Sequence, residues 1–314
     1  MIRTSHYLFA ALCLGSLFAC SRQFTDSYIV PKWCFAVFML FIVLAYEAVN
    51  ILFYRQNEQK DTRISVYGFI IVISCFLQAM FGVVQFFGFF QISTTLWVTG
   101  SFDNPAGFAA CLCAGFPFVG FLLSDSNKYI RYVGGLIGFV IVIAVILSQS
   151  RAGIMSIAFI CFILLNMKFF HKRWVKYLSL LCFALLLSGC YWMKKDSADG
   201  RLLIWRCSVS MVKDAPWLGH GIGSFEARYM DYQADYFRQY GLNRYSMLAD
   251  NVKHPFNEYL GVLLNFGFVG LLMILALITL LIYCYKKHPC AEKRIAFCSL
   301  ISIGVFSFFS YTFT

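Results

Sequence analysis

The sequence predicts an all-α fold, a polytopic bundle of about nine transmembrane helices with one long extracytoplasmic loop that contains short helices. The first observation is the composition, because 60% of the 314 residues are hydrophobic and only 13% are charged. No water-soluble domain of this length tolerates such a surface. The second is a series of apolar runs long enough to cross about 30 Å of hydrocarbon, which takes about 20 helical residues. The third is a polar stretch, residues 194–255, that is too long to be a turn.

Each apolar run accounts for one expected helix. The first run is short and follows Arg3, so a signal peptide is the alternative, and "LFAC" ending at Cys20 loosely resembles a lipoprotein cleavage site. Phe18 fits that site poorly, which favours a first membrane helix. The last run stops at Thr314 without a polar flank, so we expect further spans in a complete chain. The expected helices cover residues 6–20, 33–53, 64–90, 105–123, 129–147, 152–170, 174–193, 256–285 and 295–314.

Lysine and arginine residues predict the orientation of these helices. Fourteen of them fall on alternate connections between the spans, whereas the short connections on the opposite side hold only Arg22, Lys32 and Arg151. The positive-inside rule therefore places the N-terminus in the cytoplasm and residues 194–255 outside. The net charge of +11 reflects this topology, and nothing else in the sequence indicates nucleic-acid binding.

The cysteines and acidic residues form no recognisable redox or metal motif. Nearly all of the thirteen cysteines lie in or at the ends of apolar runs, and no CxxC pair occurs. The exceptions, Cys207 and Cys290, fall on opposite sides of the predicted membrane. No DxD pair is present, so the usual carboxylate cage for a metal-bound nucleotide sugar is missing. We therefore expect no cofactor, no metal site and a metal-independent reaction.

The long loop opens with an amphipathic segment. A helix is predicted from Asp199 or Gly200 to the stop at Pro216. Its apolar face is expected to rest on the membrane surface or on neighbouring spans, which leaves Arg201 and Arg206 near the interface. The residues of this face are Leu202, Trp205, Val209 and Val212.

Two further patterns follow in the loop. The stretch "GHGIG", residues 219–223, resembles a phosphate-binding glycine run, but no βαβ context surrounds it, so a tight turn is favoured. Aromatic residues then recur at helical spacing. An interfacial belt or packing surface is the favoured interpretation, and stacking on sugars is the alternative. The aromatic residues are Phe225, Tyr229, Tyr232, Tyr236 and Tyr240.

Polar residues gather at the outer ends of three expected spans. His254 precedes Pro255, a residue favoured in a helix first turn, and Asn257 and Glu258 follow it. A lone histidine there is usually a cap or a solvated side chain. Arg151 separates two apolar runs, and "TGSFDNPAGFAA" opens a span at residues 99–110. A boundary cation is costly unless it is paired or faces a polar cavity, so its occurrence beside the other polar segments favours a functional site over a snorkelling side chain.

Four segments resemble, in order and in membrane side, those of the O-antigen ligase and polymerase family of membrane glycosyltransferases. The segment "GSFDNPA" is similar to the family's "GTFxNPN", and "SRAG" to its "SRGG" or "SRGA" box. In the loop, "GRLLIWRCSVSMVKDAPWLGHGIGSF" is similar to "GRxxxW…PxxGxGxxxF". Finally, "HPFNEYLGVLLNFGFVGLL" is similar to "HxHNxxLxxxxxxGxxGL". The resemblance covers residues 99–272, and the first three spans add little to it.

The chain departs from the family pattern at two positions. Phe256 stands where many members have a second histidine, so the catalytic role passes to His254. Ala106 replaces the second asparagine of the first segment, which weakens a substrate contact there.

The resemblance implies transfer of a glycan from an undecaprenyl-diphosphate carrier to an acceptor hydroxyl, in surface polysaccharide and lipopolysaccharide biosynthesis. The implied location is the periplasmic face of the bacterial inner membrane, and the acceptor is lipid A core, a growing glycan or a protein. Membrane lipids are the other implied partners. Residues 1–98 would be N-terminal transmembrane helices, and residues 99–314 the catalytic membrane region with its loop 194–255.

The same resemblance implies the roles of individual side chains. Guanidinium groups stay protonated and present a fork of donors to phosphate oxygens, which suits a diphosphate leaving group. The expected catalytic residues are His254, Arg201 and Arg151, and the expected substrate-binding residues are Arg206, Asn104 and Asn257.

Two other functions are compatible with the sequence. A transferase that uses a polyprenyl monophosphate sugar would place an acidic base in the first outer loop, where Asp26 stands. A transporter or flippase of the lipid-linked glycan would carry charged residues within its spans, and Glu47 is the one clear case. A cavity centred on Glu47 would favour transport, and one covered by the long loop would favour transfer.

Overall fold

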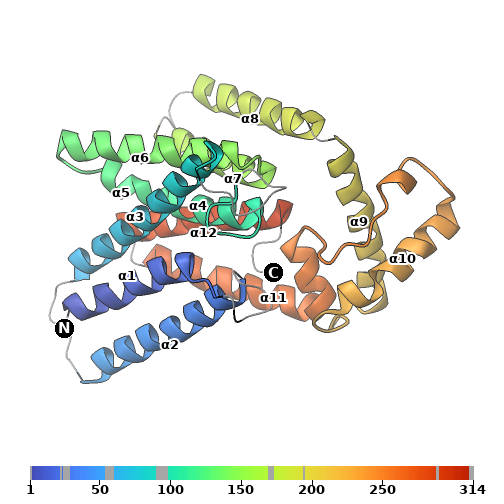
Figure 1. Cartoon of the computed structure of the whole chain (residues 1–314), viewed down its shortest axis with the longest axis horizontal. Helices are drawn as coiled ribbons and strands as arrows, with labels where there is room; N and C mark the ends of the chain where they lie inside the picture. Colours follow the sequence, from blue (N-terminus) through green and yellow to red (C-terminus); the bar gives the residue numbers. More distant parts are fainter. Residues whose placement is uncertain are drawn as a thin grey trace. The chain divides into compact units, whose positions relative to one another are not determined.

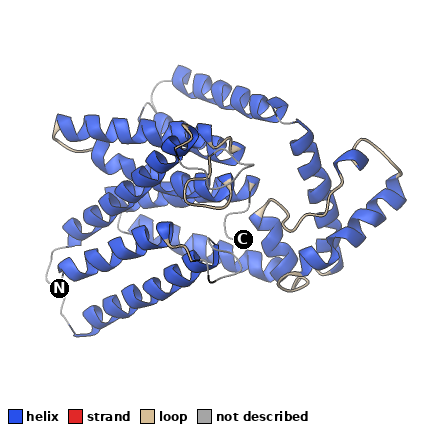
Figure 2. Cartoon of the chain, in the orientation of Figure 1, coloured by secondary structure: helices blue, strands red, loops and turns tan. Residues whose placement is uncertain are grey.

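The computed structural model describes residues 2–21, 23, 29–53, 60–89, 98–168, 173–193, 195–287 and 290–310. Over these residues the secondary structure is entirely helical (Figure 2), which confirms the predicted all-α class. Each of the nine apolar runs coincides with a helix or a consecutive pair of helices (Figure 1). The helices at these runs are α1 (Ile2–Phe18), α2 (Ile29–Phe53), α3 (Lys60–Phe86), α4 (Pro105–Gly115) with α5 (Val119–Leu123), α6 (Lys128–Leu147), α7 (Arg151–Lys168), α8 (Arg173–Met193), α11 (Glu258–Lys287) and α12 (Ala291–Phe309).

Five stretches of the described residues are long and apolar enough to cross a membrane, and two shorter apolar helices accompany them. The chain is therefore a polytopic helical membrane protein, while the remaining predicted spans, the orientation and the division at residue 98 stay predictions. The five are Val30–Val49, Val66–Phe86, Pro105–Leu123, Lys128–Leu147 and Glu258–Lys287, and the two shorter helices are Thr4–Phe18 and Arg151–Asn166.

The chain forms two compact units, which we describe separately. The N-terminal unit comprises Met1–Ile157 and Ala291–Ser302, and the C-terminal unit comprises Ala158–Cys290 and Ile303–Thr314.

In the N-terminal unit, buried polar side chains on α3 hold the segment that opens α4. Gln85 accepts hydrogen bonds from the backbone N–H groups of Thr99 and Gly100, both at 2.9 Å. About two turns earlier on the same side of α3, Gln78 donates to the Ser101 hydroxyl at 2.6 Å. Burying an amide costs free energy unless its hydrogen bonds are satisfied, and here the loop backbone satisfies them. The two glutamines thus fix the "TGSF" segment against α3.

The start of α4 follows from its sequence. The Asn104 side chain accepts from the Gly107 N–H at 2.7 Å, and Pro105 begins the helix. This is the usual N-cap arrangement, with proline where no intrahelical donor is needed. Gly100 adopts φ +57°, and a Cβ there would lie 2.4 Å from the Phe108 ring. The spacing of "GSFDNPA" therefore has a local structural reason.

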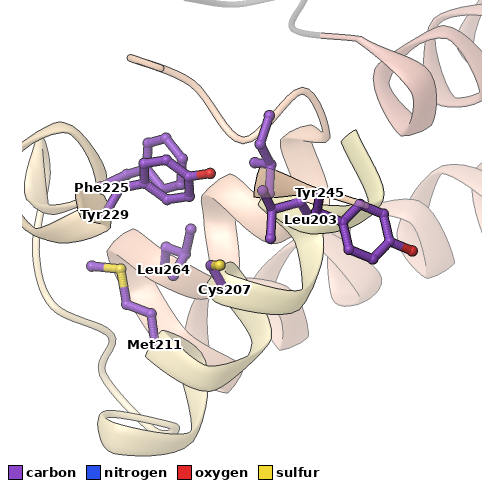
Figure 3. Packing of buried hydrophobic residues seen from close by; sticks show 8 residues of the cluster. Leu203, Cys207, Met211, Phe225, Tyr229, Tyr245 and Leu264 are labelled. Atoms are coloured by element: carbon purple, nitrogen blue, oxygen red, sulfur yellow. The ribbon is translucent and has the colours of Figure 1, made fainter. Parts of the chain in front are cut away.

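In the C-terminal unit, the polar loop folds into two substantial helices rather than short ones. They are α9 (Lys195–Asp214) and α10 (Ser224–Tyr240), followed by the single turn η2 (Ser246–Leu248). Helix α10 packs against α9 and against the start of α11, as Figure 1 also shows. A buried apolar cluster joins the three helices (Figure 3). Its members are Leu203, Ile204, Cys207, Met211, Phe225, Tyr229, Tyr245 and Leu264.

This cluster corrects two predictions about α9. The helix begins at Lys195, one turn before the predicted start at Asp199 or Gly200. The predicted apolar face is only partly the buried one: Trp205 and Val212 pack against the cluster, whereas Leu202 and Val209 are exposed and Leu203 and Cys207 are buried instead. The physical reason is that positions 203, 207 and 211 recur at the same helical spacing as the predicted stripe, about 100° further round the helix. The predicted stop before Pro216 is confirmed, since α9 ends at Asp214.

The aromatic row of α10 divides between two environments. Phe225 and Tyr229 are buried and stack on each other with ring centroids 4.9 Å apart. Figure 3 shows both rings on one side of the cluster, opposite Tyr245. Tyr240, in contrast, is 62% exposed. The packing interpretation is thus confirmed for the first two aromatic residues of the row.

Candidate functional site

The helix that follows the His254 segment, α11, contains a break. At Gly267 the backbone adopts φ +60° and ψ −157°, a conformation that is essentially restricted to glycine. The break leaves backbone groups of Leu264 and Asn265 without partners in the helix. Their carbonyls accept instead from the N–H groups of His220 at 2.7 Å and Gly221 at 3.1 Å.

Residues after the break in turn donate hydrogen bonds to the segment that follows α9. The N–H of Phe268 donates to the Pro216 carbonyl at 2.8 Å, and that of Val269 to the Trp217 carbonyl at 3.2 Å. We call the paired segments 216–221 and 264–269 the clasp. The glycines of "GHGIG" have positive φ values of +69°, +91° and +78°, which confirms the tight turn. The clasp fixes the first half of α11 relative to α9.

The His220 side chain stabilises this turn through two hydrogen bonds. Its Nδ1 accepts from the Arg228 guanidinium at 3.0 Å, so its Nε2–H is assigned as the donor to the Met211 carbonyl at 2.8 Å. Both ring nitrogens are occupied by structural partners. Of the two histidines predicted on the outer face, His254 is therefore the one we keep as a catalytic candidate.

His254 lies in the short segment between η2 and α11. The helix begins at Glu258, so the prediction that Pro255 occupies its first turn is wrong. Asn257 is buried and its Oδ1 accepts from the Leu260 N–H at 3.1 Å, which makes it the N-cap. Asn257 was expected to bind substrate, and its side-chain oxygen is engaged in the cap.

Phe256, between Pro255 and this N-cap, has an unusual backbone. It adopts φ +52°, one of two non-glycine positive φ values within the described residues, the other being at Gln149. A left-handed conformation costs about 1–2 kcal/mol for an L-residue. The Pro255 carbonyl next to it accepts from Trp205 Nε1 at 3.0 Å. Neighbouring side chains thus hold the His254 segment in a defined, strained path.

Arg201 contacts this segment directly. Its guanidinium lies over the Phe256 ring with Cζ 5.0 Å from the centroid, and Nη1 donates to the Phe309 carbonyl. The side chain is half-buried. The structure therefore brings Arg201 against a residue only two positions from His254. A cation held on an aromatic face and a backbone carbonyl is a preorganised donor for an anionic group.

Arg206 belongs to a different group of side chains. Five residues after Arg201 on the helix, it points to another side, where Nη1 donates to the Tyr236 hydroxyl at 3.4 Å. Its Cζ also lies 5.2 Å from the centre of the Tyr245 ring. Arg206 is exposed, and the structure does not bring it to Phe256.

The two remaining predicted residues lie in the N-terminal unit. Arg151 is the first residue of α7 and is partly buried. Ser150 caps the start of this helix, because its hydroxyl accepts from the Gly153 N–H at 3.3 Å. Asn104 caps α4, and its Nδ2 also donates to Asp103 at 3.1 Å. Asn104 thus has a local structural role.

Of the two residues on which the alternative functions depend, the structure describes Glu47 but not Asp26. Glu47 accepts hydrogen bonds from Ser5 and, at 3.3 Å, from Tyr67, so it joins α1, α2 and α3. It lies six residues before the end of α2. Asp26 falls outside the described residues. In the described part of the chain, no group of three or more His, Cys, Asp or Glu side chains is arranged to hold a metal ion.

Sequence reasoning missed three contributors to this region: Trp205, Phe256 and Tyr245. Trp205 was assigned to an apolar stripe, although its indole N–H needed a partner, which the Pro255 carbonyl provides. Phe256 was treated only as a missing histidine. Tyr245 has no periodic pattern around it, and only tertiary packing shows that it closes the cluster.

Long apolar helices together with a folded polar unit define the chain as a polytopic helical membrane protein. Residues 136–275 match the family model Wzy_C, described as O-antigen ligase. Over these residues the chain is similar to an O-antigen ligase domain, and the matched stretch includes Arg151, Arg201, Arg206 and His254 but not Asn104. This is a family of enzymes, and it implies ligation or polymerisation of polysaccharide at a membrane. Neither a curated protein nor a solved structure matches the chain.

Proposed function

We propose that this protein transfers a glycan from undecaprenyl diphosphate to an acceptor hydroxyl at the outer face of the bacterial inner membrane. The observation that supports the proposal best is the position of Arg201, whose guanidinium lies 5.0 Å over the ring of Phe256 in the His254 segment. A permanent cation packed against the segment that carries an imidazole supplies the two kinds of group that this reaction needs.

In the proposed reaction, the acceptor oxygen forms a bond to the anomeric carbon while the bond from that carbon to the diphosphate oxygen breaks. The diphosphate leaves with the electron pair, and the hydroxyl proton passes to His254 or to solvent. Arg201 stabilises the charge that develops on the leaving diphosphate. Such stabilisation accelerates transfer because it is stronger in the transition state than in the bound carrier.

The test follows glycan transfer and lipid diphosphate release in membranes that contain the full-length protein. We expect His254→Ala and Arg201→Ala to lose transfer by at least about 100-fold, as is typical for loss of an acid–base or charge-stabilising group. Arg238→Gln is the matched control, because Arg238 is an exposed arginine of the same loop that pairs with nearby Asp235 at 2.8 Å. Equal activity of all four proteins would reject the site.

His254 can act as a base or can orient the acceptor, and His254→Gln separates these roles. A glutamine side chain keeps hydrogen-bonding capacity but cannot accept the proton at neutral pH. Strong loss of activity in His254→Gln would support the base, and substantial retention would support orientation.

Arg151 is a second proposed contact for phosphate oxygens. It opens α7 in the segment that resembles the family's arginine box, and it is tested independently of Arg201. Arg151→Lys keeps the charge but removes the bidentate fork, so we expect weaker transfer with normal insertion. Transfer equal to that of the wild type would show that Arg151 only snorkels to the interface.

The proposal includes a metal-independent reaction. We expect full activity in excess EDTA, and abolition that Mg²⁺ reverses would overturn this point. A flippase function would instead appear as movement of the intact lipid across the membrane. A monophosphate-sugar transferase would accept a donor that releases polyprenyl monophosphate. The acceptor is identified from the product of the same assay as lipid A core, a growing glycan or a protein.

A further inference from the structure

Two arginines of the C-terminal unit lie against one tyrosine ring. Arg206 comes from α9 and Arg244 from the segment after α10, and their Cζ atoms lie 5.2 Å and 4.7 Å from the centre of the Tyr245 ring. Tyr245 is only 4% exposed, whereas both arginines are exposed. A buried ring thus has two solvent-accessible cations against it. We call Arg206, Arg244 and Tyr245 the arginine pair site.

Local hydrogen bonds fix this arrangement. Arg244 Nη2 donates to the Tyr245 hydroxyl at 2.6 Å. The Asn243 side chain accepts from the Tyr245 N–H at 2.9 Å, which makes a compact turn around these residues. On the other side, the Tyr236 hydroxyl accepts from both Arg206 and Asn243 at 3.4 Å. The cations are therefore positioned before any ligand binds, which lowers the entropic cost of binding.

The charge of the pair is only partly compensated by neighbouring residues. Within the described part of the chain, neither arginine has a carboxylate within salt-bridge distance. Asp199 acts on Arg244 from further away and is itself buried and hydrogen-bonded by the Tyr191 hydroxyl at 3.2 Å. Two like charges held near each other repel, and an anion that bridges them would relieve that repulsion. The site is therefore a ready binding place for an oxyanion.

An exposed aromatic surface adjoins the pair. Tyr236, which contacts Arg206, has its ring centroid 5.0 Å from that of Tyr240, and Tyr240 is 62% exposed. Aromatic rings present apolar faces on which the C–H faces of sugar rings can pack. Guanidinium forks beside an exposed tyrosine are suited to a sugar that bears a carboxylate or a phosphate.

We propose that the arginine pair site binds an acidic sugar residue of the glycan substrate. This inference rests on the proposed glycan transfer and assigns the chemical class of sugar that the protein selects. The site differs from the region of Arg201 and His254, because Arg206 points to another side of α9 and contacts Tyr236 and Tyr245. Arg206 and Arg244 are here specificity-determining residues, and neither touches the bond that breaks.

The test measures equilibrium binding to the full-length protein in detergent, without turnover. Three probes are used: a uronic-acid oligosaccharide, a neutral oligosaccharide of equal length, and a short-chain prenyl diphosphate. We expect wild type to prefer the acidic over the neutral oligosaccharide. Arg206→Gln and Arg244→Gln should each lower the affinity for the acidic oligosaccharide by about 10-fold, as expected for loss of a charge-assisted hydrogen bond. The affinity for the neutral oligosaccharide should not change.

Matched variants make each outcome decisive. Arg238→Gln removes another exposed arginine of the same loop and should bind the acidic probe as wild type does. Arg244→Lys keeps the charge and should recover part of the affinity, which guards against a variant that simply misfolds. No preference for the acidic probe, or no loss in either Gln variant, would overturn the proposal. If the Gln variants lost affinity for the prenyl diphosphate alone, the proposal would also be overturned, and the two arginines would instead be a second contact for the lipid carrier.

Failure of this inference is distinguishable from failure of the proposed function. If wild type binds the acidic oligosaccharide through both arginines but never transfers glycan, the sugar site stands and the transferase proposal fails. If wild type transfers neutral and acidic glycans equally, and the Gln variants do the same, the transferase proposal stands and the sugar site fails.

Discussion

Substitution of Gly267 by alanine tests the clasp that positions the start of α11. A Cβ at this position would lie 2.3 Å from both the carbonyl carbon and the carbonyl oxygen of Trp217. Neither atom belongs to a flexible side chain, so the backbone itself must move. The alanine would also have to keep φ +60° and ψ −157°, which costs about 1–3 kcal/mol outside glycine.

The expected magnitude follows from these two effects. Movement of the backbone would break at least two of the four hydrogen bonds in the clasp, at about 1 kcal/mol each. With the strain of the backbone conformation, Gly267→Ala should destabilise the fold by about 3 kcal/mol or more. At roughly 2 °C per kcal/mol for a chain of this size, the midpoint of thermal unfolding should fall by about 6 °C or more.

The assay follows the fraction of detergent-solubilised protein that stays monodisperse after heating. Gly261→Ala is the matched control on the same helix, because a Cβ there meets only Pro255 Cγ at 3.7 Å and Glu258 Oε2 at 4.0 Å. Alanine is the better helix former by about 0.5–1 kcal/mol, so the control should be unchanged or slightly more stable. Equal midpoints for Gly267→Ala and wild type would refute the reasoning, as would an equal loss in the control.

Three further outcomes follow from the C-terminal unit. The Tyr232 hydroxyl donates to Asp214 at 2.6 Å, and this carboxylate, with a smaller contribution from burial, raises the pKa of Tyr232 to about 12. Because the folded pKa is raised above the ordinary value of about 10, the stabilisation is complete below pH 10 and is lost between pH 10 and 12. Tyr232→Phe should cost about 1 kcal/mol at pH 8, and its deficit relative to wild type should shrink above pH 10 in thermal unfolding. Burial raises the pKa of the Cys207 thiol to about 11, so maleimide should label Cys207 at pH 8 only when the protein unfolds, which mass spectrometry measures. Trp205→Phe removes the bond to the Pro255 carbonyl and should lower stability by about 1 kcal/mol, and an unchanged melting midpoint would contradict this.

The sequence was sufficient for the fold class because membrane helices are determined by local composition. Each apolar run coincides with a helix, since a backbone within hydrocarbon must satisfy its own hydrogen bonds. The face of α9 was not predictable in the same way. Leu202 and Leu203 are equally apolar, and only the positions of Phe225 and Leu264 decide which of them is buried.

The candidate site was predictable where motifs are local and not where contacts are distant. The segments with Arg201 and His254 were recognisable as motifs, and the structure places Arg201 on Phe256, two positions after His254 in the sequence. Neither motif shows that Phe256 adopts a left-handed backbone or that Trp205 holds Pro255. The grouping of Arg206 with Arg244 also depends on tertiary structure, because 38 positions separate them in the chain.

The central claim is tested most directly by the stoichiometry of the reaction in membranes. Polyprenyl-diphosphate-linked glycan is supplied to wild type, Arg201→Ala, His254→Ala and Arg238→Gln, and transferred glycan and released lipid diphosphate are counted together. We predict that wild type and Arg238→Gln transfer glycan and release an equimolar amount of lipid diphosphate. Arg201→Ala and His254→Ala are predicted to lose both activities. Movement of the intact lipid across the membrane without release of diphosphate would contradict the account and identify a transporter.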